Sequence, residues 1–273
     1  MVALHCEAKP IIDEYGLKKA CSKPYDHYIN NTISSQPIEL VVTGIGALAM
    51  ATAVGWVGAQ THSSQRIWLN VGTAGHAERK LGESVLVHGV GDEVLQRSHY
   101  PALVAKWNGS TDAVLSVSAP STEYPGGAAV DMEAYAFFNS ALRFSDSELV
   151  QSIKVISDNE ESGIEHLDAV KLTEFISQGM SSIKAYIGEL LLIAPNVFNV
   201  NFDIDRVLQL RGTHSQRLQV QELIQKLQFM EKLSGIFEQL IACNNLKAVL
   251  VILRNELDLA IPSIGVGKAD NNG

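Results

Sequence analysis

The chain has 273 residues, a formal net charge of −9 and 46% hydrophobic residues. The acidic balance argues against a nucleic acid or a membrane surface as partner, because both are bound through basic faces. No apolar run approaches the roughly 20 residues of a membrane span, and the first ten residues show no signal peptide. Cys6, Cys21 and Cys243 are too widely spaced for a disulfide framework or a metal site, so a reduced, cytoplasmic location is expected.

Short apolar runs alternate with helical patterns over residues 1–195, which we predict to form one domain. "MVALHC" at 1–6 predicts a first strand, small residues at helical spacing predict a close-packed helix over 45–60, and 166–192 predicts a long amphipathic helix that Pro195 ends. This alternation is typical of an α/β fold with a largely buried sheet. Further strands are predicted at 38–44, 66–75, 83–90, 112–119, 128–133 and 149–159, with a helix at 134–144.

The character of the chain changes after Pro195. Residues 203–262 carry leucines at helical spacing and no strand pattern, which predicts a helical extension. This extension is either an appendage docked on the core or on a neighbouring subunit, or a module that binds a partner. The tail at 263–273 is expected to be disordered.

Acidic residues and glycine turns follow several of the predicted strands. Burying a carboxylate without a partner is costly, so the acids of "AAVDMEAYAFF" at 128–138 need a partner from the protein, from water or from a ligand. Ligands of open α/β sheets gather at the carboxyl ends of the strands. We therefore expect Glu7, Glu133 and Asp158 to face one crevice together with the turns at 43–46 and 70–75, and Asp131 to be structural.

Five motifs in this order give the chain a resemblance to a known family over residues 1–193. It resembles the nucleoside phosphorylases and nucleosidases, which include uridine phosphorylase, the hexameric purine nucleoside phosphorylases and methylthioadenosine/S-adenosylhomocysteine nucleosidase. The resemblance implies a three-layer αβα fold with a central mixed, mostly parallel sheet. It also implies a homo-oligomer, either a dimer or a hexamer. The motifs are "EAKPII", "VVTGIG", "NVGTAG", "VDMEAYA" and "VISD".

The family's reaction explains why acids are needed at these positions. Cleavage of the N-glycosidic bond of a purine-type nucleoside passes through an oxocarbenium-like sugar while negative charge builds on the base. By resemblance, Asp158 is the general acid at N7 of the purine, and Ser157 orients it. Glu133 accepts hydrogen bonds from the ribose hydroxyls, and Met132 packs under the ribose face.

The same resemblance gives roles to residues of three other segments. Glu7 matches the acid that positions the attacking water in the hydrolytic branch. Backbone N–H groups of Thr73, Ala74 and Gly75 approach the ligand where a side chain would not fit, and Tyr124 is the predicted stacking lid over the base.

Each role has a structural alternative. Glu133 could instead satisfy the first turn of a helix, Asp158 could cap a turn, Glu7 could be solvent-exposed, and Tyr124 could be a packed surface aromatic.

The sequence favours water slightly over phosphate as the nucleophile. Phosphate sites prefer Arg, whereas here Asn70 lies near the glycine turn, and the first loop offers Lys9 and an acid. No cofactor or metal is expected, with phosphate left open as a co-substrate. A phosphorylase and a non-catalytic nucleoside-binding or interaction protein remain as alternatives. A dinucleotide-binding oxidoreductase is disfavoured, since no G-x-G-x-x-G follows the first strand.

Overall fold

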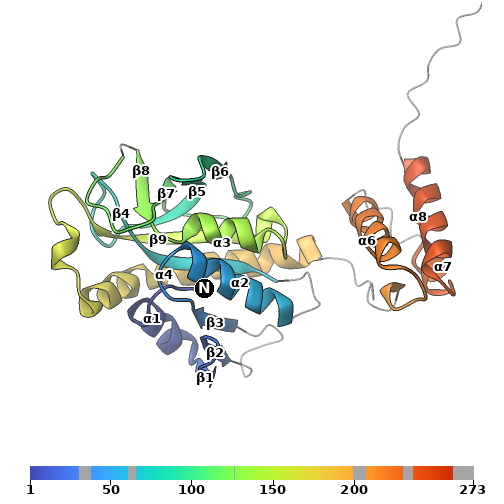
Figure 1. Ribbon diagram of the computed structural model, residues 1–273, viewed down its shortest axis with the longest axis horizontal. Helices are drawn as coiled ribbons and strands as arrows, with labels where there is room; N and C mark the ends of the chain where they lie inside the picture. Colours follow the sequence, from blue (N-terminus) through green and yellow to red (C-terminus); the bar gives the residue numbers. More distant parts are fainter. Residues whose placement is uncertain (31–37, 61–65, 126, 199–206, 230–235, 261–273) are drawn as a thin grey trace, which may run out of the picture. The chain divides into compact units, whose positions relative to one another are not determined.

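The computed structural model describes residues 1–30, 38–60, 66–125, 127–198, 207–229 and 236–260. The chain separates into two compact units, Met1–Phe198 and Asn199–Gly273, and the first holds all the strands named here (Figure 1). Its helices are α1 (His5–Tyr15), α2 (Ala47–Gln60), α3 (Ala134–Ala141) and α4 (Ala169–Phe198). Its strands are β1 (Lys18–Cys21), β2 (Asp26–Asn30), β3 (Ile38–Val42), β4 (Trp68–Gly75), β5 (Ser84–Asp92), β6 (Arg97–His99), β7 (Ser110–Ser116), β8 (Ala128–Asp131) and β9 (Val150–Asp158).

The main sheet is mixed, as expected, but it closes on itself, whereas we expected an open three-layer arrangement around a central sheet. Its order is β6-β5-β7-β8-β4-β9, and β9 also pairs with β5, so that five strands form a ring. The pairs β5–β7, β7–β8 and β4–β9 are parallel, and β4–β8 and β5–β9 are antiparallel. The long strand β5 closes the ring because one of its edges pairs with β7 along most of its length, while the other edge pairs with β9 at its first residues and with β6 at its last. Closure leaves fewer unpaired edges.

Helices pack on both faces of these strands. Alternate residues of one strand belong to different clusters, since side chains of a strand point to opposite faces: Val85 and Ile156 pack with α2 and α3, and Leu86 and Val155 pack with α1 and α4. Figure 1 shows α2 and α3 side by side, in accord with their contacts. The small residues of α2 allow close packing, because a Cβ on Gly58 would lie 2.5 Å from Cε1 of Phe144.

The prediction of a first strand over 1–6 is wrong. Val2 makes only an isolated bridge with Val42, and α1 begins at His5. The reason is Glu7, whose Oε2 accepts the backbone N–H of Ala3 at 3.1 Å and of Leu4 at 3.0 Å and thereby caps the first turn of the helix.

Three further differences concern a second sheet, strands that were not predicted, and the end of the long helix. The strand predicted at 38–44 appears as β3, but in a separate antiparallel sheet of order β1-β2-β3. Strands β1, β2 and β6 were not predicted, and α4 continues through Pro195 to Phe198. Among the described helices, none is long and apolar enough to cross a membrane.

The second unit is helical where it is described and has a core of its own. Its helices are α6 (His214–Phe229), α7 (Phe237–Ile241) and α8 (Leu246–Ala260). Helices α6 and α8 pack against each other, and Arg254 donates a hydrogen bond from Nη2 to Oε1 of Gln219 at 2.9 Å. The fully buried side chains of this core include Val220, Ile224, Leu227, Leu240, Leu246, Val249 and Leu253. The tail predicted at 263–273 lies outside the described residues.

Candidate active site

Glu7 joins the start of α1 to the glycine-rich end of β4. Its side chain is buried, and Oε1 accepts hydrogen bonds from the backbone N–H of Thr73 at 2.9 Å and from Oγ1 of Thr73 at 3.1 Å. The structure therefore brings together two residues that the sequence placed in one site. Glu7 reaches β4 from the first turn of a helix and not from the end of a strand.

Asp158 ends β9 and lies against the end of β4. Gly75 pairs with Asp158 in the sheet, and Asp158 is buried. Its Oδ1 accepts a hydrogen bond from Oγ of Ser157 at 2.5 Å, and its Oδ2 accepts one from the hydroxyl of Tyr124 at 2.7 Å. Ser157 Oγ also lies 3.4 Å from the carbonyl oxygen of Ala74. All five residues were predicted for the site from the sequence, and the hydrogen bond between Tyr124 and Asp158 was not.

Glu133 lies at the joint between β8 and α3, at the N-cap position of the helix. It is buried, and its Oε1 accepts the backbone N–H of Gly46 at 2.6 Å, from the turn that a positive φ of 94° allows at Gly46. Burial, followed by the charge of Asp131, raises the pKa of Glu133 to about 7. Met132, between the two acids, is partly exposed.

Lys154 was not predicted as a site residue. It is fully buried on β9, beside Asp131, Glu133 and Glu7. Its Nζ lies 2.8 Å from Oδ2 of Asp131. Burial alone would lower the pKa of Lys154, but the carboxylates of Asp131, Glu133 and Glu7 outweigh burial and raise it. The sequence offered a sign of this residue, because a lysine inside the apolar strand "SIKVISD" is a buried charge that needs a partner, as are the acids at 131 and 133.

Asp131 is held as a structural carboxylate. Its Oδ1 accepts a hydrogen bond from Oγ of Ser116 at 2.6 Å, and its Oδ2 accepts the backbone N–H of Ala134 at 2.8 Å as well as the ammonium of Lys154. The antiparallel pairing of β8 with β4 explains why Asp131 meets Lys154. Val130 pairs with Gly75, so the next residue of β8, Asp131, lies further towards the start of β4, where Gly72 pairs with Lys154.

The acids thus gather along one stretch of β4. Glu7 Oε1 and Lys154 Nζ both lie close to Gly72, at 3.2 and 3.4 Å from the position of a Cβ there. Thr73 holds Glu7, and Gly75, two positions further along β4, pairs with Asp158. Three buried acids, Glu7, Glu133 and Asp158, therefore lie together with backbone and hydroxyl donors around β4.

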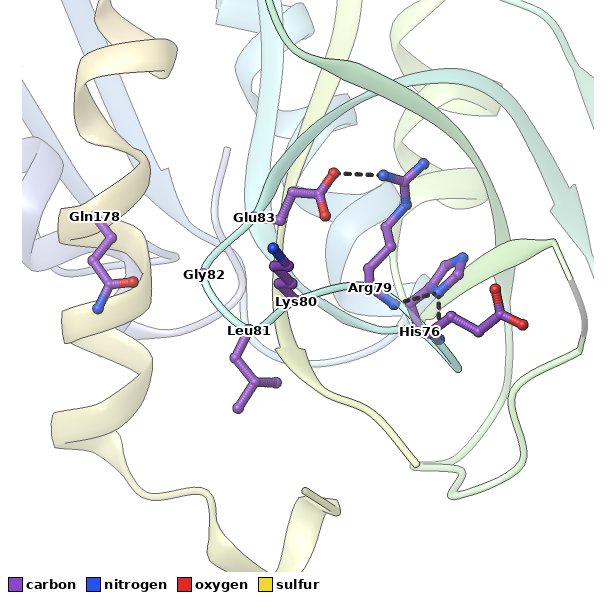
Figure 2. A pocket seen from close by; sticks show the side chains of 8 residues that line it. His76, Arg79, Lys80, Leu81, Gly82, Glu83 and Gln178 are labelled. Atoms are coloured by element: carbon purple, nitrogen blue, oxygen red, sulfur yellow. Dashed lines mark hydrogen bonds and ion pairs between the residues drawn. The ribbon is translucent and has the colours of Figure 1, made fainter. Parts of the chain in front are cut away.

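A cavity of about 730 Å³ lies between the loop after β4 and α4, and none of the predicted site residues lines it. Among its lining residues, Arg79 bonds to Glu83, and Nδ1 of His76 accepts the backbone N–H groups of Glu78 and Arg79 (Figure 2). Behind the lining, Arg79 also bonds to Asp112. The backbone N–H of His76 also donates to the carbonyl of Asp158 at 3.0 Å. These bonds support the loop next to the acids. Among the described residues, no group of three His, Cys, Asp or Glu side chains could hold a metal ion.

No protein-family model matches the chain, and no curated protein matches it by sequence. The 5′-methylthioadenosine/S-adenosylhomocysteine nucleosidase of S. pneumoniae, solved with a transition-state inhibitor, matches in structure with a TM-score of 0.54 at 16% identity, over 69% of this chain and 97% of that chain. The chain has the nucleosidase fold.

Two further nucleosidases share this fold at similarly low identity. The 5′-methylthioadenosine nucleosidase of Arabidopsis thaliana matches with a TM-score of 0.57 at 14% identity, over 69% of this chain and 93% of that one. A nucleosidase of Chlamydia trachomatis matches with a TM-score of 0.54 at 17% identity, over 69% and 96%. The nucleosidase fold here is thus nearly complete, and about a third of the chain lies outside the match.

The raised pKa of Glu133 gives a first testable prediction. The unfolded chain loses this proton near 4.5, the usual pKa of glutamate, whereas the folded protein keeps it to about pH 7. Between these values the folded state binds more protons, so the free energy of unfolding falls as the pH rises, by about 3 kcal/mol in total. Urea unfolding across this range measures it, and Glu133→Gln is expected to remove that part of the slope. Equal slopes in both proteins would contradict the assignment.

Proposed function

We propose that the first unit cleaves the N-glycosidic bond of a purine-type nucleoside. The observation that supports this most is a pair of buried carboxylates, Glu133 just after β8 and Asp158 at the end of β9, the two strands that flank β4. Their hydrogen-bond donors are an N–H group and hydroxyls, which a sugar diol and a protonated base nitrogen could replace or supplement. The fold shared with solved nucleosidases supports the same reaction class.

In the proposed reaction, the bond between C1′ and the base nitrogen breaks and its electron pair moves to the base. Asp158, oriented by Ser157, delivers a proton to N7 of the departing purine. Glu133 accepts hydrogen bonds from the ribose hydroxyls and stabilises the developing cation, with Met132 under the sugar. The raised pKa of Glu133 implies that the rate of cleavage rises with pH through about 7, because the ionised form of Glu133, which accepts these hydrogen bonds, then becomes populated.

Water is favoured as the nucleophile. Glu7 is proposed to position this water next to the backbone of Thr73, Ala74 and Gly75, and to accept the proton that the water loses as its oxygen bonds to C1′. The buried carboxyl groups around this point are those of Glu7, Glu133 and Asp131, and the buried side-chain cation beside them is Lys154. A phosphate dianion would be repelled there, and Lys154 is already paired with Asp131.

A nucleoside panel with and without phosphate tests the proposal. We expect free base to be released from at least one purine nucleoside, 5′-methylthioadenosine being the first candidate, at a rate that does not depend on phosphate. Chromatographic detection of base and sugar measures it. A strict need for phosphate would make the protein a phosphorylase, and tight binding without turnover would make it a nucleoside-binding protein.

We further propose that the protein acts in the cytoplasm as a homo-oligomer. The cysteines are unpaired thiols. The large apolar side chains of Ile45 and Leu48 are 59% and 80% exposed beside the turn that holds Glu133, and a second copy would cover them. Light scattering on the full chain tests this.

A further inference from the structure

Tyr124 is turned inward from an exposed stretch of chain. Its neighbours Thr122, Glu123 and Pro125 are exposed, whereas Tyr124 is partly buried. Its hydroxyl donates a hydrogen bond to Oδ2 of Asp158 at 2.7 Å. Burial and this carboxylate both raise the pKa of Tyr124, so the phenol keeps its proton and remains a donor.

The ring of Tyr124 lies directly over Gly75. A Cβ built on Gly75 would be 2.5 Å from Cε1 of Tyr124 and would also collide with Oδ2 of Asp158. The absence of a side chain at 75 therefore lets the ring reach the carboxylate. A base that approached the backbone at this turn would need the same space.

Both oxygens of Asp158 are engaged in this arrangement. Oδ1 accepts from Ser157 at 2.5 Å, and Oδ2 accepts from Tyr124. A purine nitrogen can exchange a proton with Asp158 only from within hydrogen-bond distance of one of these oxygens. Ser157 precedes Asp158 on the strand and is buried, so the side that a ligand can take over is the one Tyr124 occupies.

We propose that Tyr124 fills the base site of the free protein, with its hydroxyl in the place of the base nitrogen that exchanges a proton with Asp158, and that the substrate must displace it to reach Asp158. This inference rests on the proposed function, because it assigns a competitor to the same site. Tyr124 then sets the affinity for the base through the fraction of molecules in which the site is open.

The variant Tyr124→Phe separates this role from stacking, because it keeps the ring and removes only the hydroxyl. Loss of one hydrogen bond to a charged group is expected to shift the balance towards the open site and to lower KM about ten-fold. We expect kcat to stay within about two-fold, since the displaced tyrosine touches no reacting atom. Tyr100→Phe is the matched control, because Tyr100 is 77% exposed.

Kinetics on the best substrate of the nucleoside panel measures both constants. An unchanged or raised KM in a folded Tyr124→Phe protein would overturn the proposal. A fall in kcat at constant KM would overturn it too, by making the hydroxyl part of the proton transfer.

A measurement without turnover keeps the inference testable if no nucleoside is cleaved. The full chain is labelled with ¹³C at the tyrosine ring, and the Tyr124 signal is assigned by its loss in Tyr124→Phe. In Asp158→Asn this signal is expected to titrate at lower pH than in the wild type, because a neutral amide replaces the carboxylate.

Addition of millimolar adenine to the labelled wild type is expected to move the Tyr124 signal towards that of an exposed tyrosine. A signal that adenine leaves unchanged would overturn the proposal. Displacement of Tyr124 by adenine without any base release from nucleosides would instead refute the proposed enzymatic function, while the occupation of the base site by Tyr124 would still hold.

Discussion

Asp158→Asn is expected to lower the rate of base release by about a thousand-fold, within the range for loss of a general acid. Asparagine keeps the size of the side chain and cannot deliver a proton to the departing base. The loss should fall on kcat rather than on KM, because the proton moves only in the transition state. Steady-state kinetics measures it.

The control for this variant is Asp13→Asn, an acid on α1 whose side chain is 63% exposed. It is expected to keep wild-type rates. Thermal melting of both variants shows whether the fold is intact. An Asp158→Asn protein that melts like the wild type and still turns over within a few-fold of its rate would remove Asp158 from the mechanism.

Lys154→Met is expected to have the largest effect on stability. It leaves the buried carboxylate of Asp131 without its cation, which lowers the free energy of unfolding by about 3–5 kcal/mol. Urea unfolding followed by tryptophan fluorescence measures this in the first unit, where all three tryptophans of the chain lie.

The matched control is Lys184→Met, which removes an exposed lysine paired with Glu14 on the surface and should change stability by less than about 1 kcal/mol. Adding Asp131→Asn to Lys154→Met should restore part of the loss, because the unpaired charge is then gone. A loss below about 1 kcal/mol for Lys154→Met would contradict the assigned role of the pair.

Much of the candidate site could be predicted because its chemistry is local in sequence. The two acids in "VDMEAYA" interrupt an apolar run and therefore require partners, and the glycines of "NVGTAG" mark a close approach. Glu7 lies beside Thr73, another predicted site residue, but on a helix and not at the end of a strand. A strand pattern at 1–6 cannot reveal that Glu7 caps its own helix.

The closed sheet was beyond reach of the sequence because pairing of β5 with β9 depends on residues about seventy positions apart. The antiparallel register of β8 against β4 likewise decides that Asp131 meets Lys154. Lys154 itself was detectable, since it stands inside an apolar strand. Tyr124 was predicted over the base, but only its three-dimensional placement reveals that its hydroxyl takes Asp158.

Incubation with 5′-methylthioadenosine in ¹⁸O-labelled water, without phosphate and with mass-spectrometric detection, tests bond cleavage and its nucleophile together. We expect free adenine and a sugar that has gained one ¹⁸O at C1, from wild type and not from Asp158→Asn. The contradicting result is that 5′-methylthioadenosine and other purine nucleosides all stay intact after prolonged incubation, with phosphate added as well. The protein would then not cleave the glycosidic bond.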